Sequence, residues 1–253
     1  MSDLLHSRID GPDDAPPLVL LGSLGSTLAM WEPNVSALAA RFRVVRLDNL
    51  GHGGSPVPAG PYSMAGLADA ALATLDSLGL DRVSWAGLSL GGMVGMYLAA
   101  EHPERISALA LCCTTAYFPD KTPWLQRIET VREQGTGAIA EPVAARWFTP
   151  EWSAEHPDVL KTAVGWIAGI SDAGYAASCE AIVEWDHRER LSAIQAPTLV
   201  LGGADDLATP VDPHARTLAD GIPGARLEIV PGGHVATFES AEAANRLLLE
   251  HLV

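Results

Sequence analysis

Short apolar runs rich in Leu and Val recur along the chain, and longer segments with helical spacing separate them. These runs predict β-strands at Leu18–Leu21, Val44–Leu47, Val83–Ala86, Ala108–Cys112, Thr198–Gly202 and Leu227–Val230. Strands that alternate with helices are typical of an α/β fold, in which helices cover both faces of a mostly parallel sheet. Leu4–Ile9 precedes a turn-forming Gly-Pro pair and is expected to pair antiparallel with the first of these strands as an edge hairpin.

Helical spacing is clearest in two segments. Leu67–Leu78 repeats apolar residues every three to four positions, and residues 238–252 do the same near the end of the chain. Between about 114 and 190 the strands stop while helical patterns continue, which predicts a helical cap inserted over the sheet. No repeat or linker marks a second unit, so residues 1–253 are expected to form a single domain that includes this cap.

The composition excludes several classes of partner. The 253 residues carry 31 acidic and 16 basic side chains, a net charge of −15. Nucleic acids bind clustered Lys and Arg, so no nucleic-acid partner is expected. No apolar run approaches the roughly 20 residues of a membrane helix, so no membrane partner is expected either. The N-terminus lacks a secretion signal, and the adjacent Cys112 and Cys113 suit buried free thiols, which together indicate a cytoplasmic location.

The strongest chemical signal lies in Gly87-Leu88-Ser89-Leu90-Gly91, between a predicted strand and a helical pattern. A Gly-x-Ser-x-Gly motif in this setting predicts a nucleophile elbow, a strained turn that exposes a serine hydroxyl. The two glycines are needed because side chains at those positions would collide with neighbouring backbone. Ser89 is therefore the candidate nucleophile.

A serine hydroxyl needs a base to activate it and a carboxylate to orient that base. His234 follows a predicted strand and two glycines, which favours it over the other histidines. Asp205 and Asp206 both follow the strand Thr198–Gly202, and the distance to Thr209-Pro210 favours Asp206 as the acid. Asp205 is expected to face solvent or to cap a helix. The order Ser89, Asp206, His234 is that of the α/β-hydrolase fold.

The remaining histidines have other expected roles. His52 lies in a Gly-His-Gly-Gly loop, where a structural hydrogen bond is more typical than catalysis. Four more lie in polar helical surroundings and are expected in solvent, namely His102, His156, His187 and His251.

Stabilising a tetrahedral oxyanion requires two backbone N–H groups. One follows the nucleophile, at Leu90, and the other is assigned to Leu24, in the loop after the strand Leu18–Leu21. The sequence has no cluster of metal ligands, no phosphate loop and no dinucleotide fingerprint, so neither a metal nor another cofactor is expected.

Several segments resemble the 3-oxoadipate enol-lactonases, which are β-ketoadipate enol-lactone hydrolases of the α/β-hydrolase family. The similar segments are Gly22-Ser23-Leu24-Gly25-Ser26-Thr27 with Met30-Trp31, the elbow Gly87–Gly92, Trp124–Ile128, and Glu141–Pro150 in the cap. Two positions depart from the family pattern: Gly22 stands where the lactonases often have Asn, and Leu50 stands where Arg commonly precedes Gly-His-Gly.

The resemblance implies hydrolysis of 3-oxoadipate enol-lactone to 3-oxoadipate in aromatic degradation, through an acyl-enzyme on Ser89. Guanidinium groups bind carboxylates through bidentate hydrogen bonds, so a cap arginine is expected to bind the carboxylate arm of the substrate. The implied substrate contacts are Ser23, Trp124, Arg127, Arg146 and Trp147.

Other interpretations remain open at this stage. Each cap arginine could instead form a surface ion pair, and each cap tryptophan could belong to the core of the cap. The whole chain could be a general carboxylesterase, a cofactor-free perhydrolase, or a non-catalytic binding protein of the same fold. The sequence does not indicate an oligomeric state.

Overall fold

The computed structural model describes residues 4–252, which build a seven-stranded sheet in the order β1-β3-β2-β4-β5-β6-β7. The strands are β1 (Ser7–Asp10), β2 (Pro17–Leu21), β3 (Arg43–Leu47), β4 (Val83–Leu88), β5 (Ile106–Cys112), β6 (Thr198–Gly203) and β7 (Arg226–Val230). Every neighbouring pair is parallel except β1 with β3. The observed strands β2 to β7 therefore match the six predicted apolar runs to within a few residues.

The predicted partner of the N-terminal strand was wrong. β1 is antiparallel at the edge of the sheet, but it pairs with β3, with Ser7 opposite Leu47 and Asp10 opposite Val44. The physical reason is that β3 and β4 occupy both sides of β2, so β2 has no free backbone groups for a third strand. The N-terminal segment adds instead to the outer side of β3.

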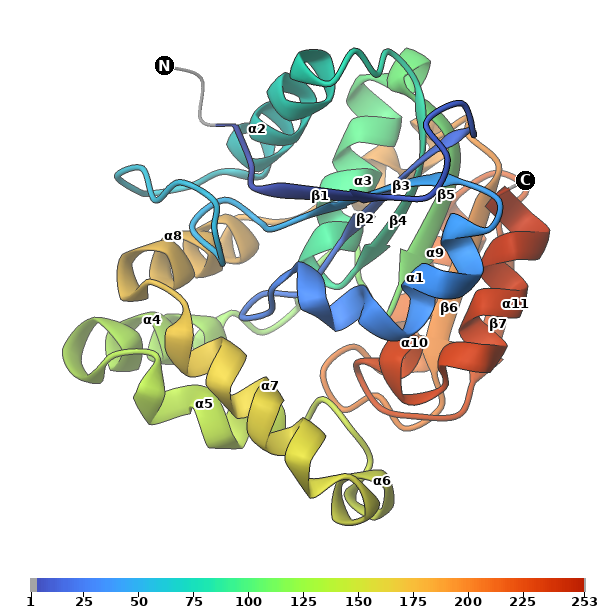
Figure 1. Cartoon of the computed structure of the whole chain (residues 1–253). Helices are drawn as coiled ribbons and strands as arrows, with labels where there is room; N and C mark the ends of the chain where they lie inside the picture. Colours follow the sequence, from blue (N-terminus) through green and yellow to red (C-terminus); the bar gives the residue numbers. More distant parts are fainter. Residues whose placement is uncertain (1–3, 253) are drawn as a thin grey trace.

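Helices cover both faces of the sheet (Figure 1). One layer contains α1 (Glu32–Ala39), α10 (Ala236–Glu239) and α11 (Ala241–Leu252), which contact one another, while the opposite layer contains α2 (Met64–Ser77) and α3 (Leu90–Glu101). The short helix α9 (Arg216–Gly221) packs on the 3-10 segment η3 (Arg188–Ala193), which also contacts α3. Further 3-10 or irregular turns are η1 (Leu28–Trp31), η2 (Pro103–Arg105) and η4 (Val211–Ala215). The sheet with its two helical layers is the predicted α/β class.

The two predicted helices differ slightly from the observed ones. α2 begins earlier than the apolar spacing indicated, because the hydroxyl of Ser63 caps its first turn by accepting from the Gly66 N–H at 3.1 Å. Its inward face is the predicted one, with Leu67, Ala71 and Leu75 buried. Residues 238–252 do not form one helix, because Ser240 leaves helical geometry (φ −118°, ψ 49°) and separates α10 from α11.

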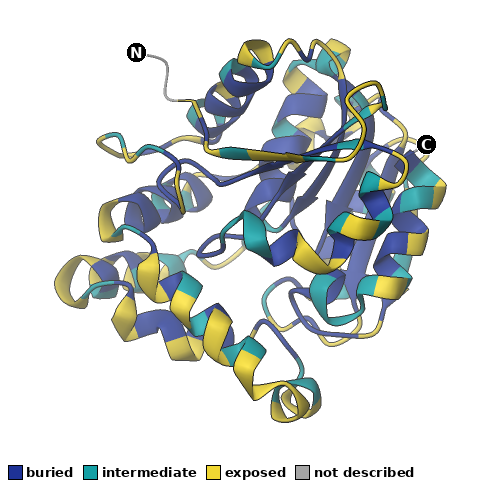
Figure 2. Cartoon of the chain, viewed as in Figure 1, coloured by how far each residue is buried: buried dark blue, intermediate teal, exposed yellow. Residues whose placement is uncertain are grey.

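The predicted helical insertion appears as five helices at one end of the molecule (Figure 1). They are α4 (Thr122–Gln134), α5 (Gly137–Ala144), α6 (Pro150–Glu155), α7 (Pro157–Gly169) and α8 (Asp172–Val183). Figure 2 shows that the strands at the centre of the sheet are buried, whereas the edge strand β1 is partly exposed and the cap helices are exposed on their outer faces. Within residues 4–252, no helix combines the length and apolar character that crossing a bilayer requires.

Candidate active site

The nucleophile elbow joins β4 to α3, with Ser89 at the turn. Ser89 has a φ of 55°, a left-handed conformation that non-glycine residues rarely adopt and that is concentrated at functional sites. A Cβ atom at Gly87 would lie 2.1 Å from the Gly91 carbonyl oxygen, and one at Gly91 would lie 2.2 Å from the Leu21 carbonyl oxygen. Both glycines are therefore required by close backbone approach, as the motif predicted.

Neighbouring strands hold the elbow in place. The Ser89 N–H donates to the Cys112 carbonyl at 2.9 Å, and the Thr114 hydroxyl donates to the Ser89 carbonyl at 2.7 Å. The end of β5 thus fixes the strained turn on one side. On the other side, the Gly91 N–H donates to the Gly22 carbonyl at 3.0 Å, which ties the first turn of α3 to the loop after β2.

His234 and Asp206 meet at the carboxyl edge of the sheet. His234 Nδ1 lies 3.0 Å and 3.1 Å from the two carboxylate oxygens of Asp206. Asp205, one residue earlier, is exposed, whereas Asp206 is buried with 3 % of its surface accessible. The structure thus brings His234 to Asp206 rather than to Asp205.

The Asp206 carboxylate also accepts hydrogen bonds from its own loop. The Thr209 hydroxyl donates at 2.7 Å, and the backbone N–H groups of Ala208 and Thr209 donate at 2.7 Å and 2.9 Å. Burial alone would raise the pKa of Asp206. The charge interaction with His234 and these hydrogen bonds outweigh burial, and together they lower the pKa to about 2. Asp206 therefore stays ionised at any pH near neutrality.

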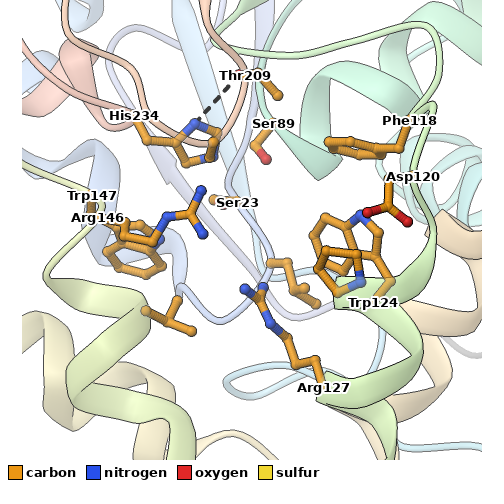
Figure 3. A pocket seen from close by; sticks show the side chains of 14 residues that line it. Ser23, Ser89, Phe118, Asp120, Trp124, Arg127, Arg146, Trp147, Thr209 and His234 are labelled. Atoms are coloured by element: carbon orange, nitrogen blue, oxygen red, sulfur yellow. Dashed lines mark hydrogen bonds between the residues drawn. The ribbon is translucent and has the colours of Figure 1, made fainter.

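Ser89 and His234 both line a cavity of about 160 Å³ beneath the cap, and Figure 3 shows their side chains pointing into it. The hydrogen bonds of the His234 ring within residues 4–252 all involve Nδ1, which leaves Nε2 free to face the serine. Contacts between a nucleophile and its base are often long in ligand-free enzymes and shorten when substrate binds.

The two assigned oxyanion donors differ in their relation to the cavity. Leu24 lines the cavity beside Ser89, and Leu90 is the first residue of α3. Backbone N–H groups in the first turn of a helix have no acceptor within the helix, and the helix dipole adds a partial positive charge there. The Leu90 N–H therefore has no acceptor within α3, and the Leu24 N–H donates to no acceptor in its loop, so within residues 4–252 both remain candidate donors.

All five expected substrate contacts line this cavity: Ser23, Trp124, Arg127, Arg146 and Trp147. Arg127 lies 4.8 Å from the Trp124 ring centroid and donates weakly, at 3.4 Å, to the Tyr175 hydroxyl. Arg146 donates to the Leu207 carbonyl at 2.6 Å. Neither arginine forms an ion pair among the described residues. The alternative that they are surface ion pairs with cap glutamates is therefore wrong.

Sequence reasoning missed several residues of the cavity wall: Phe118, Asp120, Pro123, Val143, Ala208 and Thr209. Only Thr209 had a usable signal, since it lies three residues after Asp206 and so within reach of the carboxylate. Phe118 and Asp120 precede α4 in a loop without regular spacing, and Figure 3 shows Asp120 across the cavity from Arg146. Among the described residues, no group of three or more potential metal ligands comes together.

Two expectations about the remaining histidines were also wrong. His251 is partly buried rather than solvated, and its Nε2 lies 3.0 Å from the Leu109 carbonyl oxygen and 3.2 Å from that of Pro197. His187 is buried rather than solvated, because its ring stacks on Trp185 with centroids 4.6 Å apart. Burial lowers its pKa to about 4. His52 makes structural hydrogen bonds, as expected, to Gly25 and Leu50.

Comparison with known proteins agrees with this geometry. Residues 16–241 match the alpha/beta hydrolase fold family, and the chain belongs to that family. It is 35 % identical to 3-oxoadipate enol-lactonase 2 of Acinetobacter baylyi over 93 % of this chain and 88 % of the relative. It is also 31 % identical to a putative carbamate hydrolase, RutD, of Stutzerimonas stutzeri, over 98 % of this chain and 95 % of that protein.

Solved structures give the same picture. An enol-lactonase from Burkholderia xenovorans superimposes with a TM-score of 0.95 at 39 % identity, covering 97 % of this chain and 95 % of that one. A thermophilic esterase from Thermogutta terrifontis superimposes with a TM-score of 0.91 at 29 % identity, covering 97 % and 92 %. The resemblance to enol-lactonases that the sequence motifs indicated is therefore confirmed.

Proposed function

We propose that this chain is a serine hydrolase that opens the lactone ring of 3-oxoadipate enol-lactone to give 3-oxoadipate. The enol-lactonases among its relatives support a lactone hydrolase. The observation that carries the finer assignment is a single cavity that holds Ser89, His234 and two arginines without carboxylate partners. In a lactone that bears a carboxylate arm, the ring would lie at Ser89 and His234 and the carboxylate would lie at the two arginines.

In the proposed reaction, Ser89 Oγ attacks the ring carbonyl carbon while His234 Nε2 takes the hydroxyl proton. Asp206 keeps the proton on Nδ1 and stabilises the imidazolium that forms. The N–H groups of Leu24 and Leu90 donate to the tetrahedral oxyanion. When the intermediate collapses, the ring C–O bond breaks, and the released enolate oxygen takes the proton from His234. The enol then becomes a ketone.

The second half of the reaction repeats these roles with water. His234 takes a proton from the water molecule, whose oxygen attacks the acyl carbon on Ser89. Collapse of this second tetrahedral intermediate breaks the ester bond, and His234 returns the proton to Ser89. Every proton is exchanged between substrate, water and these side chains, so the proposal needs no cofactor.

The charges around the cavity give the substrate one orientation. Arg127 and Arg146 would bind the carboxylate arm, and the rings of Trp124 and Trp147 would bound the apolar part of the lactone. Asp120 lies across the cavity from Arg146 (Figure 3), and hydrogen bonds from Thr122 lower its pKa, so it stays ionised and repels a carboxylate on that side. A cytoplasmic location is part of the proposal, since all three cysteines are buried free thiols.

The proposal is tested by steady-state hydrolysis of 3-oxoadipate enol-lactone and of p-nitrophenyl acetate, with Ser89→Ala as the control. We expect fast turnover of the lactone, weak turnover of the ester, and loss of both in the variant. Turnover of the ester without the lactone would leave Ser89 as nucleophile and make the chain a general esterase. Activity retained in Ser89→Ala would refute the serine mechanism.

A further inference from the structure

The loop after β2 carries the Leu24 N–H, and its position relative to Ser89 decides whether that donor can reach an oxyanion. Local contacts shape the turn itself. The Ser26 N–H and hydroxyl both donate to the Ser23 carbonyl, at 3.1 Å and 2.8 Å, and the Ser26 hydroxyl also lies 2.9 Å from Met30 Sδ. The base of the loop is tied to α3 through the Gly91–Gly22 hydrogen bond. The Ser26 contacts hold the Ser23–Leu24 peptide group, which carries the Leu24 N–H, and leave the next peptide group, Leu24–Gly25 at the tip of the loop, to be held from elsewhere.

His52 holds that tip. Its Nε2 accepts the Gly25 N–H at 3.0 Å, which is the hydrogen bond that reaches the Leu24–Gly25 peptide group within residues 4–252. Its Nδ1 lies 3.1 Å from the Leu50 carbonyl oxygen, an acceptor, so Nδ1 carries the proton and Nε2 carries the lone pair. The two contacts together require a neutral imidazole in one tautomer.

The surroundings of His52 suit this neutral form. The ring is buried with 1 % of its surface accessible, and burial lowers its pKa to about 4, against the raising effects of the Leu50 carbonyl and the Asp48 charge. Tyr175 of α8 stacks on the imidazole with ring centroids 6.5 Å apart. Arg127 of the cap donates to the Tyr175 hydroxyl at 3.4 Å.

The cap closes on the same tip from the other side. Gly25 has a φ of 82°, and a Cβ atom there would lie 3.2 Å from both the Ile167 and the Tyr175 side chains. The tip is thus enclosed between cap helices α7 and α8 on one side and His52 on the other. The Leu24–Gly25 peptide group therefore cannot rotate without breaking the bond to His52, and its fixed position limits the movement of Leu24.

From this geometry we infer that His52 is a positioning residue: its unprotonated Nε2 fixes the Leu24–Gly25 peptide group and thereby the Cα atom of Leu24, so that the Leu24 N–H, on the preceding peptide group, stays directed to the oxyanion site. The inference rests on the proposed serine mechanism and on Leu24 as a donor, but not on the identity of the lactone. His52 does not touch the substrate, so it acts on the transition state through the loop and leaves substrate binding unchanged.

Two substitutions separate the contacts of His52. In His52→Gln, the side-chain amide reaches the position of Nε2, so its oxygen can accept the Gly25 N–H. In His52→Asn, the amide reaches the position of Nδ1, so the contact with Leu50 can form while Gly25 loses its acceptor. Removing one oxyanion donor typically costs about 100- to 1,000-fold in rate, and a displaced donor costs less.

We expect His52→Asn to lower kcat by about 10- to 100-fold with little change in KM, and His52→Gln to remain within about threefold of the parent. A small alkyl boronic acid, which mimics the tetrahedral state on Ser89, should bind His52→Asn more weakly by a similar factor. Equal losses in both variants, or a loss confined to KM, would overturn the inference. The variants can be compared on whichever substrate the parent protein hydrolyses, the lactone or p-nitrophenyl acetate. If the lactone assignment is wrong, the parent itself does not hydrolyse the lactone, and the comparison of the His52 variants on the ester still tests the inference.

A measurement on the unaltered protein covers the case in which a variant does not fold. The imidazole ¹⁵N chemical shifts of His52, assigned by comparison with His52→Gln or by selective labelling, should show a protonated Nδ1 and an unprotonated Nε2 from pH 5 to 8. An Nε2-protonated tautomer, or an imidazolium in this range, would contradict the inference, because neither can accept the Gly25 N–H.

Discussion

Asp206 is a buried carboxylate whose charge depends on a few donors around it. His234 and Thr209 offset the cost of burial, so the folded protein holds this group ionised far below the pH at which a free aspartate is protonated. The same donors fix the orientation of the carboxylate, whose two oxygens lie 3.1 Å and 3.0 Å from His234 Nδ1. Single hydrogen bonds at this residue therefore affect both the orientation of the base and the stability of the fold.

The low pKa of Asp206 predicts a pH-dependent contribution to stability. The folded pKa, about 2, lies below the unfolded value of about 3.9, so the stabilisation is complete above pH 4 and is lost as the pH falls toward 2. We expect a contribution of about 2 kcal/mol near neutrality, falling to about half of that near pH 3. Urea unfolding of the parent and Asp206→Asn between pH 3 and 7 measures it. A stability difference independent of pH would contradict the assignment.

The two cavity arginines that form no ion pair among the described residues, Arg127 and Arg146, predict a change in substrate affinity when they are replaced. Arg127→Gln and Arg146→Gln should each raise KM for the acid lactone by about 10-fold or more, because a charge-assisted hydrogen bond contributes about 1.5–3 kcal/mol. KM for uncharged p-nitrophenyl acetate should stay the same. Arg132→Gln is the matched control for Arg127→Gln, since Arg132 also lies on α4 but forms an ion pair with Glu180 at the surface. If KM for the lactone is unchanged in both Arg127→Gln and Arg146→Gln, the carboxylate binds elsewhere.

Among the elements, α10 connects the histidine loop to the cap. Glu239, at the end of α10, accepts from the Gly233 N–H at 2.9 Å and from the hydroxyl of Thr149, the residue before α6. The Val235 N–H donates to the Trp147 carbonyl at 2.9 Å. The loop that carries His234 and the cap segment before α6 are thereby joined by one carboxylate and one backbone hydrogen bond.

This junction predicts a role for Glu239 in stability and rate. Glu239→Gln weakens the charge-assisted acceptor for Gly233 and Thr149, so we expect a loss of about 1–2 kcal/mol in the free energy of unfolding. Because Gly233 precedes His234, kcat should also fall, by about 3- to 10-fold. Glu242→Gln, at an exposed position of α11, is the control and should change neither quantity. A Glu239→Gln variant as stable as the parent protein would contradict this role of Glu239.

Among the strands and helices, the sequence predicted the elements themselves better than which elements pack or pair with one another. The strands β2 to β7 are apolar runs whose length and bounds follow from local composition. The pairing of β1 with β3 depends on which strand edge is free after the others have assembled, and local composition does not encode this. His187 was misplaced for a related reason, since Trp185 and Tyr97 cover it only after α8 has packed.

Within the candidate site, Ser89 and His234 were predictable as neighbours because each follows a strand with a recognisable turn. Gly87 and Gly91 lie two positions before and after Ser89, and Gly232 and Gly233 directly precede His234. Side chains at Gly87, Gly91 and Gly233 would meet neighbouring backbone atoms. The residues that only support them carried weaker signals. Glu239 lies in a helical pattern like any surface glutamate, and its partners Gly233 and Thr149 become neighbours only in the folded chain.

Taken as a whole, the molecule builds its cavity from segments far apart in the chain. The loop after β2, the elbow after β4, the cap, and the loops after β6 and β7 all contribute lining residues. The parallel sheet explains this convergence, because the carboxyl ends of its strands lie along one edge. Beneath the cavity the core is continuous, and it includes all three cysteines.

The buried thiols predict how the whole molecule responds to a cysteine reagent. Burial raises the pKa of Cys112 and of Cys179 to about 12 and also raises that of Cys113. Because the thiolate is the reactive form, native protein should react with Ellman's reagent at least about 100-fold more slowly than a free thiol. Three thiols per chain should react after unfolding in urea. Rapid labelling of even one thiol in the native protein would show that the core opens locally.

The cap contacts described above also limit how this enzyme can be engineered. Ile167 and Tyr175 pack against the loop of Leu24, while Trp147 and Thr149 are joined to the loop of His234. A cap transplanted from a related hydrolase would bring new substrate contacts and would also replace the supports of two loops in the body. Redesign of substrate range by cap exchange therefore has to keep these four positions, or recreate their contacts, for the recipient to remain active.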